Sequence, residues 1–349
     1  MPLSRLEIHQ FRNIGSALLR PAHGLTVLLG ANAQGKTNCL EAVMLLLTGL
    51  PLRGQPDREM VQWGTEGYRL NGDWSDDAAT VVRKERSVAL HPWRRRETGP
   101  RLPAVAFGPN DVLLVKGSPE GRRRFLDELG TQVWPRYGRE LRSYQRLLTQ
   151  RNRALKTGAD DGVVKSFEPL LAQSGSYVWD MRRQLVESLA NFVPWVLGPL
   201  APGEQLDVRL QRGGHASVPT AAAFLAELET RRVDERLRGM TLTGPHRDDL
   251  VLLLGGRPAD TAASQGQQRT IALALKLAAR EALESAHGRR PVVLLDDVLS
   301  ELDARRQEAL LELVGASAQQ TFVTDTDGRG LVSLAGACYA VEAGKVREA

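Results

Sequence analysis

This chain of 349 residues is poor in cysteine, histidine and aromatic side chains. Its two cysteines, Cys39 and Cys338, are too few and too widely spaced for a disulfide framework or a C-x-x-C zinc site. No apolar run approaches the roughly 18 residues that are needed to span a bilayer. The first residues include Arg5, Glu7 and His9 and lack the apolar core of a signal peptide. We therefore expect a cytoplasmic protein with no disulfide, no zinc and no membrane partner.

The composition is otherwise that of an ordinary globular protein, with an excess of positive charge. Hydrophobic residues make up 42% of the chain and charged residues 25%, which is compatible with a full core. The formal net charge is +5. The segment from Ser118 to Asp160 contains ten basic and five acidic residues, so its excess equals that of the whole chain. Concentrated arginine is typical of a protein that binds a polyanion such as DNA.

The first informative motif follows an apolar run, Leu25–Leu29, and precedes a helical pattern. It fits G-x-x-x-x-G-K-[ST], the phosphate-binding loop (P-loop) of nucleoside-triphosphate-binding proteins. In such a loop the backbone N–H groups face the phosphates, the lysine adds a positive charge and the threonine hydroxyl binds Mg²⁺. The residues that we expect to bind nucleotide are Gly30, Ala31, Asn32, Ala33, Gln34, Gly35, Lys36 and Thr37.

Near the other end of the chain, Pro291–Asp297 is an apolar strand that ends in two carboxylates. A carboxylate after an apolar strand needs a cation or exposure to water, so we expect Asp296 to bind Mg²⁺ together with Thr37. We expect Asp297 to act as the base that activates water, with Lys36 as the second catalytic residue. The alternative role for Asp297 is to cap a helix. The cofactors that these motifs predict are ATP and Mg²⁺.

The segment Ser264–Arg269 opens a further helix. Taken alone, it is an ordinary helix N-cap. Together with the other motifs it predicts a second helix N-terminus that binds phosphate. A single subunit needs only one such terminus to bind the γ-phosphate of its own ATP. We therefore expect Ser264, Gly266 and Gln267 to contact the nucleotide of a partner, so that two subunits close head to tail over two ATPs. With the turn Ser300–Asp303, this ordered set resembles the ATP-binding-cassette (ABC) ATPases.

The periodicity changes along the chain from β-like to helical and back to β-like. Insertion of a helical arm between two halves of a head is the arrangement of the SMC-like branch of the ABC ATPases. We predict an α/β fold: an ABC-type P-loop ATPase head made of residues 1–117 and 240–349, split by an inserted, mainly helical arm at 118–239. Three prolines predict a turn or corner in this arm: Pro194, Pro199 and Pro202.

Four arginines of the arm, Arg139, Arg142, Arg146 and Arg153, are separated by three, four and seven positions. This spacing places them on one stripe of a helix. We favour a DNA-binding role for the stripe over the alternative, a solvated face.

Five segments together resemble the RecF family of bacterial DNA recombination and repair proteins, from one end of the chain to the other. The resemblance implies a weak DNA-dependent ATPase that dimerises on ATP. It also implies action at gaps or single-/double-strand junctions of DNA, where RecO-type and RecR-type mediators are directed to load recombinase. The segments are Phe11–Asn13, Val115–Asp127, Gln150–Leu155, Thr243–Asp249 and Asp296-Asp297.

Some positions depart from the usual ABC pattern. Ala33 stands where the loop usually has a glycine, which should narrow the freedom of the loop without removing its N–H groups. Asp297 stands where most members have a glutamate, and its shorter side chain holds water less well, so we expect slow hydrolysis. Thr324–Thr326 stands where a switch histidine is common, and we assign no residue to that role. Arg12 is a candidate contact to phosphate or adenine, with a strand-end charge as the alternative. His246 beside Arg247 is either functional or an ordinary loop residue.

The same ATP motifs fit two other functions. The chain could be the nucleotide-binding subunit of a membrane transporter, although such a subunit has no basic arm of this length. It could also be a scaffold that binds ATP only to dimerise and does not hydrolyse it. The role of Asp297 separates the scaffold from an ATPase.

Overall fold

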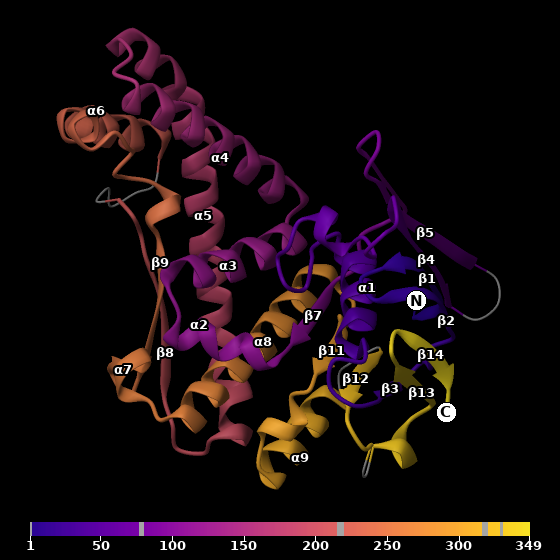
Figure 1. Ribbon diagram of the computed structural model, residues 1–349. Coiled ribbons are helices and arrows are strands. Elements are labelled where there is room, and N and C mark those ends of the chain that lie inside the picture. The colour runs from indigo at the N-terminus through magenta and orange to yellow at the C-terminus, as the bar shows by residue number, and fades with distance from the viewer. Residues whose placement is uncertain (1, 77–79, 215–219, 316–319, 329–330) are drawn as a thin grey trace. The chain divides into compact units, whose positions relative to one another are not determined.

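A computed structural model describes residues 2–76, 80–214, 220–315, 320–328 and 331–349 (Figure 1). The chain forms two compact units: residues 1–110 with 283–349, and residues 111–282. The first unit thus joins the two ends of the chain, as the sequence predicts for a split head. Within the described residues, no helix is long and apolar enough to cross a membrane.

The first unit contains two sheets. The five-stranded sheet is antiparallel in the order β2-β1-β4-β5-β6. Its strands are β1 (Leu3–Phe11), β2 (Ile14–Leu19), β4 (Gly67–Asp76), β5 (Thr80–Ala89) and β6 (Arg94–Thr98). The six-stranded sheet has the order β14-β13-β3-β12-β11-β7 and is parallel except for β14. Its strands are β3 (Leu25–Leu29), β7 (Ala104–Phe107), β11 (Val292–Asp296), β12 (Thr321–Asp325), β13 (Ala337–Glu342) and β14 (Lys345–Glu348).

Helix α1 (Lys36–Thr48) lies in the core of this unit, in contact with strands of both sheets. Its residues from Cys39 to Thr48 are all buried, because the sequence is apolar on nearly every side of the helix. Cys39 is therefore a small core residue, and burial raises the pKa of its thiol to about 12. Helix α9 (Ala304–Gly315) and the short helices η1 (Asp57–Met60), η4 (Leu299–Glu301) and η5 (Val332–Leu334) complete the unit, and η2 (Pro109–Val112) leads out of it.

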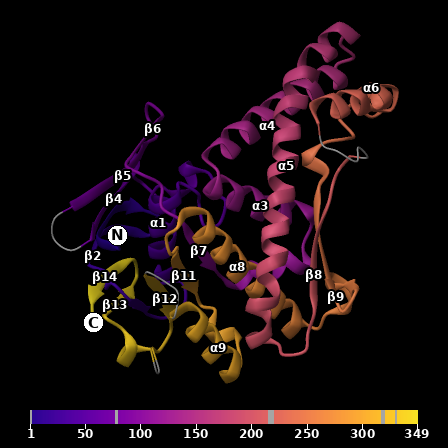
Figure 2. The same cartoon turned by 180° about the vertical axis from the view of Figure 1, so that it is seen from behind.

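The second unit is mainly helical. Helices α4 and α5 lie side by side in both views, and α6 also packs on α5 (Figures 1 and 2). The long helices are α3 (Pro119–Val133), α4 (Pro135–Lys156), α5 (Asp161–Leu200), α6 (Ala221–Arg238) and α8 (Gln265–His287), whose last turn belongs to the first unit. The shorter elements are α2 (Leu113–Lys116), α7 (Ala259–Ala262), η3 (Pro245–Arg247), β8 (Leu206–Gln211), β9 (Asp249–Leu254) and β10 (Arg257–Pro258).

Two expectations about this unit are wrong in detail. The prolines do not all mark a corner, because α5 continues through Pro194 and Pro199 and ends at Leu200. Its buried side chains, such as Val193 and Val196, hold these turns in place although each proline removes a helix hydrogen bond. The unit also extends to Ala282 rather than ending at 239, because β9 pairs with β8 along its whole length.

Candidate functional site

The predicted phosphate-binding loop connects β3 to α1, as expected. Gly35 has a φ of 118°, which a side chain would strain, and a Cβ there would lie 2.7 Å from Oδ1 of Asn13. Ala33 has a φ of 63°, so the residue that replaces the usual glycine adopts the left-handed conformation. This conformation costs a non-glycine residue about 1–2 kcal/mol.

Two hairpin turns hold this loop from outside. From the β1–β2 turn, Nδ2 of Asn13 donates to the carbonyl oxygen of Gln34 at 3.0 Å. From the β13–β14 turn, the Gly344 N–H donates to the same oxygen at 2.9 Å, and the Ala343 N–H donates to Oε1 of Gln34 at 2.6 Å. Asn13 also accepts a bond of 2.8 Å from Nδ2 of Asn38 on α1. Gln34 is thus fixed by both turns.

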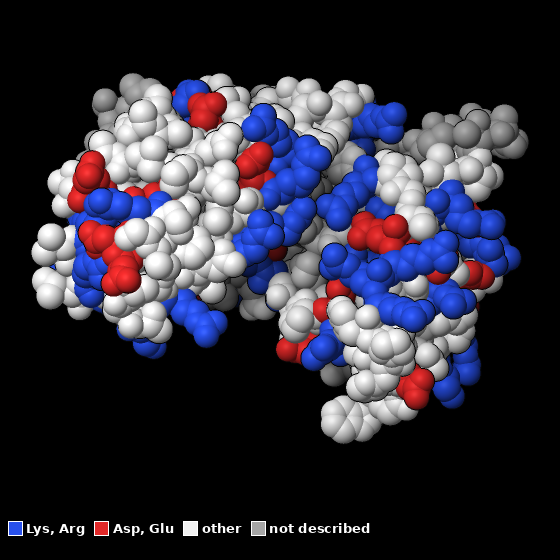
Figure 3. Space-filling view, turned by 90° about the horizontal axis from the view of Figure 1, so that it is seen from above, with Lys and Arg blue, Asp and Glu red and all other residues white. Residues whose placement is uncertain are grey.

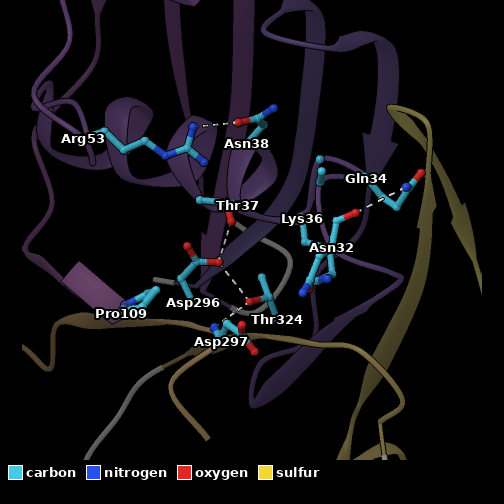
Figure 4. A pocket seen from close by; sticks show the side chains of 12 residues that line it. Asn32, Gln34, Lys36, Thr37, Asn38, Arg53, Pro109, Asp296, Asp297 and Thr324 are labelled. Atoms are coloured by element: carbon cyan, nitrogen blue, oxygen red, sulfur yellow. Dashed lines mark hydrogen bonds between the residues drawn. The ribbon is translucent and has the colours of Figure 1, made fainter. Parts of the chain in front are cut away.

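The loop and the two carboxylates lie together because their strands are neighbours. Strand β12 pairs with β3 on one side and with β11 on the other, all parallel, so the strands end at the same edge of the sheet. The Thr37 hydroxyl donates to Oδ1 of Asp296 at 2.8 Å, and the Thr324 hydroxyl donates to the same oxygen at 3.0 Å (Figure 4). Burial raises the pKa of Asp296, although both donated hydrogen bonds favour its charged form.

The second carboxylate is held by different bonds. Asp297 has a φ of 53°, and its N–H donates to the Thr324 hydroxyl oxygen at 2.9 Å. The hydroxyl of Ser300 donates to Oδ1 of Asp297 at 2.9 Å. Thr324 therefore contacts both carboxylate residues, although it is the position to which the sequence assigned no role.

These residues surround a cavity of about 360 Å³ within the first unit (Figure 4). Lys36 is 7% exposed, and its Nζ donates to the carbonyl oxygens of Gly30 at 2.6 Å and Ala31 at 3.0 Å. A second cation, Arg53, also lines the cavity and donates to Oδ1 of Asn38 at 3.3 Å. The full lining is Asn32, Ala33, Gln34, Gly35, Lys36, Thr37, Asn38, Arg53, Pro109, Asp296, Asp297 and Thr324.

Sequence reasoning missed Arg53 and Asn38. Asn38 directly follows the motif and could have been considered for that reason, whereas no local pattern marks Arg53. Arg12, in contrast, does not line the cavity. Its Nε forms an ion pair of 2.9 Å with the fully buried Glu41, and its guanidinium also donates to Glu59 and Gln55. These bonds fix the side chain of Arg12, and its contact with the nucleotide stays a prediction.

The predicted helix terminus lies in the second unit, where Ser264 precedes α8. The Gln267 N–H donates to the Ser264 hydroxyl at 3.3 Å, and the Ser264 N–H donates to Oε1 of Gln267 at 2.9 Å. This reciprocal pair is a capping box, so the ordinary N-cap interpretation holds. Ser264 and Gly266 are nevertheless exposed, and both remain accessible to a partner.

The four arginines of the predicted stripe all lie on α4 and are all exposed: Arg139, Arg142, Arg146 and Arg153. The opposite side of α4 is buried through Tyr144, Leu147 and Leu155. Basic side chains are prominent on the face that Figure 3 shows. Not all of the basic residues between Ser118 and Asp160 can contact DNA. Arg151 is fully buried and paired with Glu168 and Glu235.

His246 is an ordinary satisfied residue in this structure. Its Nδ1 lies 2.6 Å from the Tyr144 hydroxyl oxygen, and its Nε2 lies 3.1 Å from the carbonyl oxygen of Thr241. Burial lowers the pKa of His246 to about 4. Both ring nitrogens are therefore occupied by contacts within the unit, which supports a structural role for this position.

Comparisons with known proteins agree along the whole chain, although no protein-family model matches it. The "DNA replication and repair protein RecF" of Anaeromyxobacter dehalogenans (strain 2CP-C) is 41% identical over 99% of both chains. That of Myxococcus xanthus (strain DK1622) is 37% identical over 94% of this chain and 91% of the relative.

The comparison with solved structures also finds RecF proteins. The recombination mediator protein RecF with ATP, of the RecFOR pathway, matches with a TM-score of 0.88 and 28% identity, over 99% of this chain and 97% of that chain. An Smc head bound to the C-terminal winged-helix domain of ScpA matches with a TM-score of 0.56 and 15% identity, over 100% and 98%, which shows the shared fold alone. The split α/β head is thus that of the SMC-like ABC ATPases, and the chain belongs to the RecF family.

Proposed function

We propose that the chain is an ATP-dependent DNA-binding protein of recombinational repair and replication restart. The main support for an ATP site is the hydrogen bond between Thr37 and Asp296, which joins the P-loop to the end of β11. The matching solved structure is that of RecF with ATP. A transporter subunit fits less well, because the relatives described above, which match this chain over nearly its full length, are RecF proteins.

The cavity residues fit ATP with Mg²⁺. A threonine hydroxyl and a carboxylate are hard oxygen ligands of the kind that Mg²⁺ prefers, and Thr37 and Asp296 already share a hydrogen bond. Lys36 and Arg53 line the cavity and supply two positive charges that can pair with phosphate oxygens. A bound Mg²⁺ would neutralise charge that develops on the phosphates. The donors and charges of the cavity therefore match a nucleoside triphosphate.

Asp297 serves as the base that orients water for hydrolysis. Its carboxylate lines the cavity and is held by Ser300, while Thr324 fixes its backbone. Aspartate is one methylene shorter than the glutamate of most ABC members and reaches water less well, so hydrolysis is slow. This activity separates the proposed weak, DNA-dependent ATPase from a scaffold that only binds ATP.

ATP closes a head-to-tail homodimer. Ser264, Gly266 and Gln267 of one subunit contact the nucleotide of the other, because an exposed helix N-terminus with free space beside Gly266 suits a phosphate. The arginine stripe of α4 binds the DNA backbone. The family further implies action at gaps or single-/double-strand junctions together with RecO-type and RecR-type mediators that load recombinase.

Sedimentation of the full chain tests dimerisation and DNA binding together. We expect monomers without nucleotide, dimers with ATP and Mg²⁺, and a heavier complex when gapped DNA is added. Ser264→Arg should keep ATP binding by the monomer but prevent the dimer, because a bulky cation obstructs closure at the partner's phosphates. Ser166→Arg, at an exposed serine of α5, is a control for added charge. A dimer of normal strength in Ser264→Arg would refute the head-to-tail arrangement.

A further inference from the structure

The β5–β6 hairpin of the first unit carries basic and aromatic side chains that the ATP site does not use. Strand β6 begins with Arg94, Arg95 and Arg96, and Trp93 precedes them at the turn. The hairpin projects from the five-stranded sheet, in which β6 is an edge strand (Figures 1 and 2). Trp93 is 44% exposed, and all three arginines are exposed. The tip of the hairpin thus combines one large aromatic side chain with three exposed arginines.

The strand register places Arg94 and Arg96 on one face of the hairpin. Arg96 lies opposite Ser87 on β5, and Ser87 lies opposite Arg69 on β4. Residues directly opposite in antiparallel strands share a face, so Arg96 and Arg69 belong to one row across three strands. Arg69 is exposed, and its nearest carboxylate, Glu85, is 3.9 Å away. Glu85 lies on the same face, two positions from Ser87. The charge of this face that has no ion-pair partner among the described residues therefore comes from Arg94 and Arg96.

Two carboxylates near the hairpin, Glu97 and Asp57, already form ion pairs with an arginine on the opposite face of the sheet. Glu97 accepts a bond of 2.9 Å from Arg86, and Asp57 accepts one of 2.8 Å from the same guanidinium. Arg95 lies 3.5 Å from Asp57 and belongs to this inner set. Within the described ranges, Arg94 and Arg96 form no ion pair. Their charges are thus available to an external anion.

Trp93 is held by a further cation. The guanidinium of the exposed Arg58 lies over its ring, 5.2 Å from the ring centroid. A cation over an aromatic face fixes the ring and leaves a charged, flat surface at the tip of the hairpin. Trp93 directly precedes the unpaired Arg94 in the chain, so the hairpin presents an indole and free cations within a few residues. Proteins that bind single-stranded nucleic acid combine such groups, because bases stack on rings and phosphates contact cations.

The exposed arginines of β6 could instead protect this edge strand, because charged side chains there prevent it from pairing with strands of other chains. Such protection accounts for the arginines of β6. It does not account for an exposed tryptophan at the turn, which increases rather than decreases the tendency to associate.

We propose that the hairpin patch, made of Arg58, Trp93, Arg94 and Arg96, binds the single-stranded part of a DNA substrate. Arg94 and Arg96 contact phosphates, and a base stacks on Trp93. The patch rests on the proposed DNA-binding function and adds a site on the ATPase unit that is separate from the α4 stripe. Stacking of a base on Trp93 gives this site a preference for single strands, which phosphate contacts alone do not provide.

Fluorescence anisotropy with the full chain, labelled oligo(dT) and a duplex of the same length, with and without ATP, tests this site. Trp93→Ala should weaken oligo(dT) binding by about 5- to 150-fold, as expected when one base no longer stacks on a ring, and leave duplex binding unchanged. Arg94→Gln with Arg96→Gln should lower the slope of log affinity against log salt for oligo(dT) by about 1.4, because each phosphate neutralised by an arginine contributes about 0.7.

Matched controls lie in the second unit. Trp195, which is 56% exposed, is replaced by Ala, and the exposed, ion-paired Arg183 and Arg209 are replaced by Gln. An equal loss for single strand and duplex in Trp93→Ala would overturn base stacking. An unchanged salt slope in the double arginine variant would overturn the phosphate contacts. If the unmodified chain binds no DNA, the proposed function fails; if it binds DNA and the hairpin variants bind equally well, only the hairpin site fails.

Discussion

The hydroxyl of Thr37 donates a 2.8 Å hydrogen bond to Oδ1 of Asp296, a residue 259 positions further along the chain. The bond joins the end of β11 to the start of α1. It favours the charged carboxylate, against the burial that raises the pKa of Asp296. Two residues that are expected to share one Mg²⁺ are thus already in contact.

This relationship predicts how Mg²⁺ binding depends on pH. Mg²⁺ needs the deprotonated carboxylate, and the raised pKa means that Asp296 gains its proton at a higher pH than an ordinary aspartate. As the pH is lowered, the Mg²⁺-dependent affinity for ATP should therefore begin to fall at a higher pH than it would with an aspartate of ordinary pKa. Calorimetry over a pH series measures this affinity. Thr37→Val should raise the pKa of Asp296 further and weaken Mg²⁺ binding, whereas Thr37→Ser should behave like the unmodified chain. Equal behaviour of Val and Ser would contradict this role.

Asn13 should act on ATP binding without touching the nucleotide. Asn13→Ala removes the bonds to Gln34 and Asn38 and loosens the loop, so ATP affinity should fall by about 2- to 10-fold. Asn71→Ala removes a bond to Glu7 on the five-stranded sheet and serves as the control. A nucleotide titration that shows no difference between the two variants would mean that the loop keeps its shape without Asn13.

Asp297→Asn should slow ATP hydrolysis and preserve ATP-dependent dimers, because dimerisation requires only bound triphosphate. The DNA-bound state should then last longer, which a dissociation time course measures. Asparagine keeps the oxygen that accepts from Ser300, so the local backbone should be retained. Loss of nucleotide binding in this variant would instead assign Asp297 a structural or metal-binding role.

The α4 stripe should bind DNA with little dependence on base sequence. Replacing Arg139, Arg142, Arg146 and Arg153 by Gln should lower the salt slope for duplex DNA by about 0.9 for each phosphate that is no longer neutralised. ATP binding should persist, because all four residues lie outside the cavity lining. The control removes four exposed arginines elsewhere: Arg183, Arg209, Arg257 and Arg290. A thermal melt must first show that both proteins are folded, since arginine stems also cover apolar surface. Equal slopes in the two variants would mark the stripe as a solvated face.

Arg151 should matter for stability rather than for DNA. It is fully buried and bonds to Glu168 at 2.9 Å, Glu235 at 2.6 Å and Thr241 at 2.8 Å, which ties α4 to α5 and α6. Arg151→Met leaves the buried Glu235 without its ion-pair partner, while Glu168 keeps Arg232 at 3.0 Å. The substitution should lower the free energy of unfolding by about 3–5 kcal/mol. Arg153→Met, two positions away and exposed, should change it by less than about 0.5 kcal/mol in urea denaturation. Similar losses in both variants would contradict the buried-pair argument.

The sequence determined the chemistry of this protein, because that chemistry depends on short patterns. The loop from Gly30 to Thr37 and the carboxylates of Asp296 and Asp297 follow apolar strands, and such contexts are readable locally. The spacing of the α4 arginines likewise predicted their exposure, since helix geometry fixes which residues share a face.

The tertiary structure alone decided which distant groups complete the site. Strand order places Thr324 against both carboxylates, and the segment between α1 and η1 brings Arg53 to the cavity. Neither the continuation of α5 through its prolines nor the pairing of β9 with β8 is visible locally, because burial in the surrounding unit overrides local preference. Local pattern fixes which groups are present, and long-range packing fixes which of them meet.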